Sequence, residues 1–98
     1  MMTETERAEL VARLADWRGA QARPWTFHTS HGSFQLELRL AGRRAFVWCV
    51  GCKRLAFPRC WDDASLELEV LEDRCALRDS KAGFHAEIAS IRIEEDPE

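Results

Sequence analysis

The stretch SFQLELRLAGRRAFVWCV, residues 33–50, decides the fold of this chain. Apolar and polar residues alternate strictly over residues 34–40, which is typical of a half-buried antiparallel strand. Ala41-Gly42 fits a tight hairpin turn, because glycine adopts positive φ without a steric penalty. Residues 45–50 are apolar on both faces and indicate a central strand. The stretch therefore predicts a β-hairpin. In each pair of residues that face each other across it, the two sequence positions add up to 83.

An amphipathic helix is predicted over residues 4–18, ahead of this hairpin. Thr3 and Glu6 have the spacing of a capping box, in which each side chain satisfies the backbone N–H of the other residue. Gly19 fits the left-handed residue that closes a helix. Apolar side chains recur at helical spacing and would form one buried face: Leu10, Leu14 and Trp17.

Segments of period two dominate the chain after Pro24, which we expect to end a linker turn at residues 19–24. The sequence therefore predicts an α+β fold, in which the N-terminal amphipathic helix packs on an antiparallel β-meander of about six strands. The short connections favour pairing between consecutive strands, and the sheet could curl into a partly closed barrel. A change of phase near Ala89-Ser90 predicts a bulge.

One domain is expected over residues 1–98, since this length supports a single modest core. We assign the helix to 4–18, the β-meander to 25–93 and a frayed, charged tail to 94–98. The strand phases also predict which side chains point inward, in addition to the helical face: Leu36, Leu38, Leu66, Leu68, Val70 and Ile88.

The composition is that of a globular protein, with 46% hydrophobic and 32% charged residues. No apolar run is long enough to span a membrane, and the acidic, polar N-terminus is unlike a secretory signal. We therefore expect a soluble, cytoplasmic protein without a membrane partner. Its four cysteines are then expected to be thiols or metal ligands, because stable disulfides are rare in a reducing compartment.

Charge is segregated along the chain, although the net charge is only −3. Residues 39–59 carry six basic residues and no acid, whereas residues 60–98 carry four basic and twelve acidic residues. Two explanations stay open. Basic and acidic strands could become neighbours and pair across the sheet, or the basic segment could dock on an acidic partner.

A candidate metal site is formed by two pairs, His28-x-x-His31 and Cys49-x-x-Cys52. Their spacing resembles that of a zinc ribbon, in which two short knuckles are joined by a hairpin. The hairpin register would bring both pairs to the same end, where two His and two Cys suit tetrahedral Zn²⁺. The alternative is that the cysteines are small apolar strand residues and the histidines lie at an exposed strand end. We expect the protein to bind no cofactor. The alternative is that it binds Zn²⁺ at these four residues.

No set of residues has the spacing of a catalytic site, so we expect a non-enzymatic module that docks on a protein with an acidic surface. A regulator, an adaptor or a toxin-neutralising protein would act in this way. Trp and Arg are the usual energetic anchors of an interface, and the basic, aromatic-rich segment supplies Arg43, Arg44, Trp48, Arg54 and Trp61.

Two further binding modes remain as alternatives. The same segment could hold single-stranded nucleic acid, although a sequence pI near 5.6 disfavours a polyanionic ligand. A homodimer could form through an unpaired edge strand.

Overall fold

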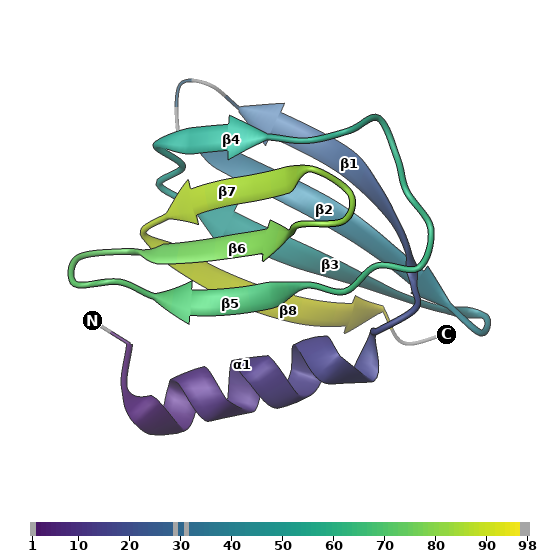
Figure 1. Cartoon of the computed structure of the whole chain (residues 1–98), viewed down its shortest axis with the longest axis horizontal. Coiled ribbons are helices and arrows are strands. Elements are labelled where there is room, and N and C mark those ends of the chain that lie inside the picture. Colours follow the sequence, from purple (N-terminus) through teal and green to yellow (C-terminus); the bar gives the residue numbers. More distant parts are fainter. Residues whose placement is uncertain (1, 29, 31, 97–98) are drawn as a thin grey trace.

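The computed structural model describes residues 2–28, 30 and 32–96, and within them the chain forms one helix and eight strands (Figure 1). The helix and the antiparallel strands together confirm the α+β class, and the eight strands are roughly compatible with the predicted meander of about six. The elements are α1 (Glu4–Asp16), β1 (Gln21–His28), β2 (Ser33–Leu40), β3 (Arg43–Val50), β4 (Arg54–Ala56), β5 (Glu67–Val70), β6 (Cys75–Asp79), β7 (Phe84–Ile88) and β8 (Ser90–Asp96).

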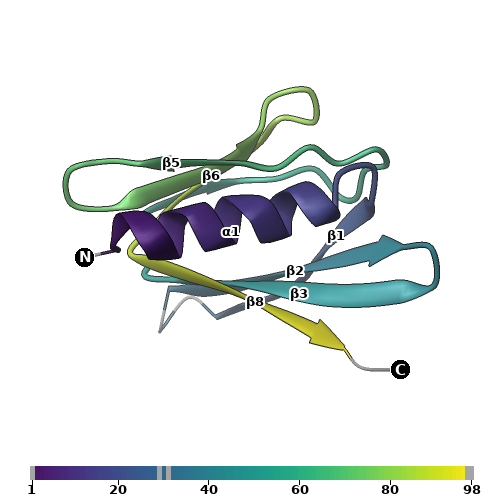
Figure 2. The ribbon, with the colours of Figure 1, turned by 90° about the horizontal axis from the view of Figure 1, so that it is seen from below.

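The strands form two antiparallel sheets rather than one meander. Sheet A has the order β1-β2-β3-β8, and sheet B has the order β4-β7-β6-β5. In the described residues the sheets lie face to face and do not close into a barrel. Helix α1 runs along one open side, between β5 of sheet B and β8 of sheet A, and contacts both (Figures 1 and 2). The helix thus covers the core from one side and leaves the outer faces of both sheets free.

Helix α1 begins at the predicted capping box. Thr3 Oγ1 accepts the backbone N–H of Glu6, and Glu6 Oε1 accepts the backbone N–H of Thr3, each at 3.1 Å. The helix ends at Asp16, two residues earlier than predicted, because Trp17 leaves helical geometry as the C-cap and Gly19 turns the chain with φ +90°. Trp17 is thereby directed into the core, where only 2% of its surface is exposed.

The β2–β3 hairpin has the predicted register. Phe34 lies opposite Cys49 and Leu38 lies opposite Ala45, so the residue numbers sum to 83. Ala41 and Gly42 both have positive φ, at 52° and 79°, as the two central residues of a type I′ turn require. The turn therefore fixes which side chains of the two strands share a face.

Strand β1 corrects the prediction of a linker, because it begins at Gln21 and contains Pro24. Proline is tolerated in this position because β1 is an edge strand of sheet A, where a missing N–H costs no ladder bond. A bulge lies between Pro24 and Thr26. Trp61, in the connection from β4 to β5, exchanges two backbone hydrogen bonds with Ala22 of β1, at 2.7 and 2.9 Å, and so ties the sheets together.

The predicted bulge at Ala89-Ser90 is instead the point where the chain passes from sheet B to sheet A. The connection from β3 to β4 crosses in the other direction at Gly51, and the two crossings touch. Ala89 donates its N–H to the Val50 carbonyl at 2.9 Å. Gly51 has φ +71°, and a Cβ on it would lie 2.7 Å from the Ala89 Cβ. Only glycine therefore fits at residue 51.

The core between the sheets contains most of the side chains predicted to point inward. Leu14, Trp17, Leu36, Leu38, Leu68 and Ile88 are buried, and Leu10 and Leu66 are half-buried. Val70 is the exception, with 36% of its surface exposed. It ends β5, which is an edge strand, so no neighbouring strand covers it there.

We predict that Leu38→Ala lowers the free energy of unfolding by about 2–5 kcal/mol, because it leaves a cavity in a packed core. Val70→Ala is the control, since it removes a similar apolar side chain from an exposed position and should cost much less. Urea denaturation of both variants provides the measurement. Equal losses would mean that the strand phases are wrong.

A second stability prediction concerns the crossing at Gly51. Gly51→Ala should cost about 1–3 kcal/mol more than Gly83→Ala, because it adds a steric overlap to the strain of positive φ that both variants share. Gly83 is a matched control, with φ +78° and nothing within 4 Å of its Cβ position. Thermal melts that give the same loss of stability for both variants would show that a Cβ at residue 51 does not clash with Ala89.

Candidate functional site

The outer face of sheet A carries aromatic and basic side chains in cross-strand rows. The register places residues from all four strands in each row, and paired residues share a face of the sheet. The bulge in β1 adds Trp25 to this face, since its ring meets that of Phe46 at 5.5 Å. The rows are Gln21–Arg39–Arg44–Asp96, Arg23–Glu37–Phe46–Glu94 and Thr26–Gln35–Trp48–Arg92.

Three arginines of the outer face lie over aromatic rings. Arg23 covers Trp25 at 5.1 Å, Arg44 covers Phe46 at 5.0 Å and Arg92 covers Trp48 at 5.1 Å, measured from the guanidinium carbon to the ring centroid. These distances are typical of cation–π contacts. The contacts place the guanidinium groups over the rings and leave Trp25 45% exposed.

Glu37 lies at the centre of this face and is only 2% exposed, although the strand pattern directs it away from the core. Arginines from three strands cover it. Arg23 Nη2 lies 2.9 Å from Oε1, Arg39 Nε lies 3.4 Å from Oε2 and Arg44 Nη1 lies 3.6 Å from Oε2. A buried carboxylate needs such partners, because an unpaired one would be very costly. Glu37 therefore gathers three guanidinium groups at one place.

The segregated charge of the sequence is explained in part by pairing between β3 and β8. Arg44 lies opposite Asp96 in the register, and its Nη2 is 2.7 Å from Asp96 Oδ2. Arg43 lies 3.9 Å from Glu95, which also meets Arg13 of α1 at 3.5 Å. Residues 94–96, expected in a frayed tail, thus belong to β8 and compensate the basic hairpin.

The outer face of sheet B differs, because its charged side chains pair with one another and no Trp or Phe lies among the paired positions of this face. Glu87 accepts from Arg74 Nε at 2.8 Å and lies 3.2 Å from His85 Nε2. Hydrogen bonding to His85 and Arg74 lowers the pKa of Glu87. Arg78 pairs with Glu69 in the same way. This pattern is typical of a solvated surface rather than a binding face.

The five residues predicted to bind a partner fall in four places. Arg44 and Trp48 lie on the outer face of sheet A. Arg43 belongs by alternation to the opposite side of β3, and its guanidinium lies over Trp17 at 4.8 Å. Arg54 lies on β4 of sheet B, where it is 79% exposed. Trp61 packs inside, stacked on Phe84 and donating its Nε1–H to buried Asp79 at 2.9 Å.

Sequence reasoning missed Arg23, because residues 19–24 were assigned to a linker turn, and it gave no role to Trp25, the first residue of the predicted β-meander. It also gave no role to Glu37, Arg39 and Arg92. The signal that could have found Glu37 and Arg39 was the hairpin register, which puts them on the same face as Arg44 and Trp48. No local signal in the sequence indicates that β8 would lie beside β3 and bring Arg92 to this face.

The predicted metal ligands are only partly described. Cys49 is fully buried in the core, and Cys52 is half-buried with its thiol 3.9 Å from the Cys49 carbonyl oxygen. His28 pairs with Ser33 and Cys49 pairs with Phe34, so His28 and Cys49 face opposite sides of sheet A. His31 lies outside the described residues. Within the described ones, no three His, Cys, Asp or Glu side chains are grouped to hold a metal. The zinc site stays a prediction.

Comparisons of the chain with protein-family models, with curated proteins and with solved structures found no match. The structure itself adds one general finding. In the part of the chain that it describes, no helix is both long and apolar enough to cross a membrane.

The cysteines yield a testable difference in reactivity. Burial raises the pKa of the Cys49 thiol, and a thiolate at Cys52 would raise it further, whereas Cys60 is exposed. Because the thiolate is the reactive form, iodoacetamide at pH 8 should alkylate Cys60 much faster than Cys49 in the folded chain. Mass spectrometry of timed digests measures both rates. All four thiols should react once the chain is denatured.

Metal analysis distinguishes protection by burial from protection by zinc, since a metal-bound thiolate is also shielded. If the predicted site exists, the purified chain holds close to one equivalent of zinc, and Cys49→Ser and His31→Ala each remove it. A metal-free chain in which Cys49 reacts as fast as Cys60 would contradict both explanations.

Proposed function

We propose that this protein is a non-enzymatic interaction module that docks through the outer face of sheet A on an acidic protein surface. It would act as a regulator, an adaptor or a toxin-neutralising protein. The observation that carries this proposal is the array of guanidinium groups over aromatic rings on one solvent-facing sheet. The matching face of sheet B has no such array in its paired positions.

Preorganisation supports the proposal. Interfaces owe most of their affinity to a few Trp and Arg anchors, and ordering such side chains on binding is costly. Here the guanidinium groups of Arg23, Arg44 and Arg92 already rest on rings, so much of that cost is met during folding. Trp25 and Trp48 would supply the apolar contact area.

Charge complementarity defines the partner. The three rows of the outer face hold four arginines against three carboxylates, so this face is positive in a chain whose net charge is −3. A partner with carboxylates beside apolar side chains would match it. Opposite charge also speeds encounter and excludes partners of the wrong sign.

Single-stranded nucleic acid fits this face less well. Bases bind such sheets by stacking on open aromatic rings, whereas arginines of the chain itself already lie over Trp25, Phe46 and Trp48. The carboxylates of Glu94 and Asp96 would also repel phosphates along the edge formed by β8.

The test compares Trp25→Ala with Phe57→Ala, because these aromatic side chains are almost equally exposed, at 45% and 44%. Only Trp25 belongs to the docking face. Proteins retained from extracts of the source cells by each tagged variant are quantified, and the retained partner is then purified and titrated by calorimetry. Trp25→Ala should weaken binding about tenfold or more, and Phe57→Ala should leave it unchanged.

Two results would overturn the proposal. One is that no protein retained by the wild-type chain is lost with Trp25→Ala while both variants remain folded. The other is that the wild-type chain binds a single-stranded oligothymidine, in a salt-dependent manner, more tightly than any protein that it retains.

A further inference from the structure

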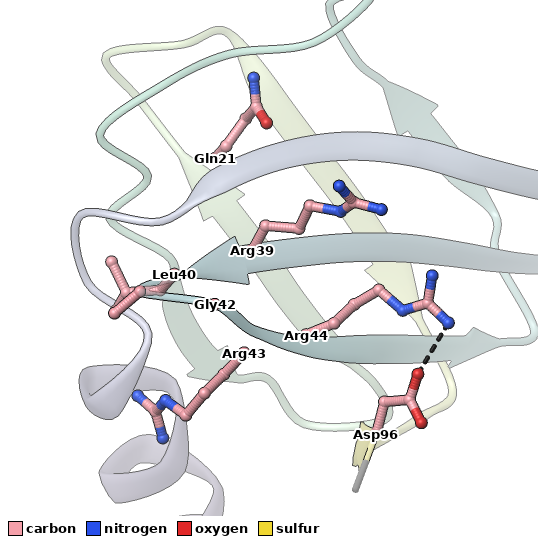
Figure 3. A pocket seen from close by; sticks show the side chains of 8 residues that line it. Gln21, Arg39, Leu40, Gly42, Arg43, Arg44 and Asp96 are labelled. Carbon is pink, nitrogen blue, oxygen red and sulfur yellow. Dashed lines mark hydrogen bonds and ion pairs between the residues drawn. The ribbon is translucent and has the colours of Figure 1, made fainter. Parts of the chain in front are cut away.

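Arg39 and Arg44 lie directly opposite each other in the end row of the outer face of sheet A. Two like charges in this relation destabilise a sheet. Figure 3 shows that both side chains extend along the same face in the same direction, while Arg43 turns away toward α1. The fold therefore holds two guanidinium groups together at a cost in stability.

The acids around this pair do not balance it. Glu37 is shared among Arg23, Arg39 and Arg44, and Asp96 binds Arg44 alone. Three arginines and two carboxylates leave one uncompensated positive charge. The contacts of Arg39 and Arg44 with Glu37, at 3.4 and 3.6 Å, are also longer than the 2.7–2.9 Å of a charge-assisted hydrogen bond. Both guanidinium groups therefore retain donors for a further anion.

A hollow of about 490 Å³ lies over this row. Its lining includes Gln21, Arg39, Arg44 and Asp96 together with the hairpin turn around Gly42 (Figure 3). Gln21 belongs to the same lining, and its side-chain amide is an uncharged hydrogen-bond donor. The hollow thus combines space, donors and a surplus of positive charge.

We infer that the Arg39–Arg44 pair is a carboxylate-binding site, which receives one aspartate or glutamate side chain of the protein partner. This inference rests on the proposed function. A single carboxylate carries the one negative charge that the cluster lacks, and its two oxygens match the planar fork of a guanidinium group. The site would fix the register of the partner on the face, while the tryptophans supply contact area.

The test uses sodium acetate as the probe and follows the Nε–H signals of the arginines in the purified, ¹⁵N-labelled chain. At constant ionic strength, acetate should shift the Arg39 and Arg44 signals to saturation, whereas sodium chloride should not. Acetate should also raise the melting temperature, because a ligand that binds only the folded state stabilises it.

Variants separate recognition from general attraction. Arg39→Gln should abolish the saturable shift without loss of stability, since it removes the repulsion with Arg44 and leaves Arg23 and Arg44 beside Glu37. Arg39→Lys keeps the charge but lacks the fork, and should weaken acetate binding severalfold. Arg92 lies on the same face but outside the hollow, so Arg92→Gln should leave acetate binding intact.

Three outcomes would overturn the inference: shifts of equal size with chloride, acetate binding that survives Arg39→Gln, or saturation by inorganic phosphate at much lower concentration than by acetate. The proposed function fails separately. Trp25→Ala should reduce partner binding while acetate binding persists. A partner that still docks on the face after Arg39→Gln, with unchanged affinity, would refute the carboxylate site and leave the docking function standing.

Discussion

The contact between Gly51 and Ala89 is the constraint on which the arrangement of the two sheets depends. The chain leaves sheet A at Gly51 and returns to it at Ala89, and the backbone groups of the two crossings bond to each other. This junction lets β4 pair with β7 and β8 pair with β3. The acidic end of β8 is thereby brought beside the basic start of β3, so the contribution of β8 to the candidate site depends on a glycine at residue 51.

Local features of the sequence were sufficient to predict the helix start and the hairpin. The capping box, the Ala41-Gly42 turn and the strict alternation over residues 34–40 each involve neighbours in sequence, and their geometry is fixed by short-range sterics and hydrogen bonds. The register that they define is correct. The contributions of β2 and β3 to the outer face of sheet A, from Glu37 to Trp48, could therefore be predicted from the sequence.

The remaining features depend on contacts between distant segments. A change of phase at Ala89 looks the same in sequence whether the strand bulges or changes sheets, because both shift the alternation by one residue. Residues 19–24 were assigned to a linker turn ending at Pro24, whereas this proline belongs to β1 and is acceptable there because β1 is an edge strand. The burial of Glu37 could not be inferred either, since the arginines that cover it come from three strands.

Strand β1 also determines how sheet A can meet other molecules. Its free edge offers few open backbone groups, because Trp61 occupies both groups of Ala22 and Pro24, next on that edge by alternation, has no N–H. The bulge that follows bends the strand away from a straight ladder. A strand from another chain would find no continuous template there. Edge-to-edge pairing through β1 is thus disfavoured, so sheet A can present aromatic side chains on its outer face without offering this edge to a strand of another chain.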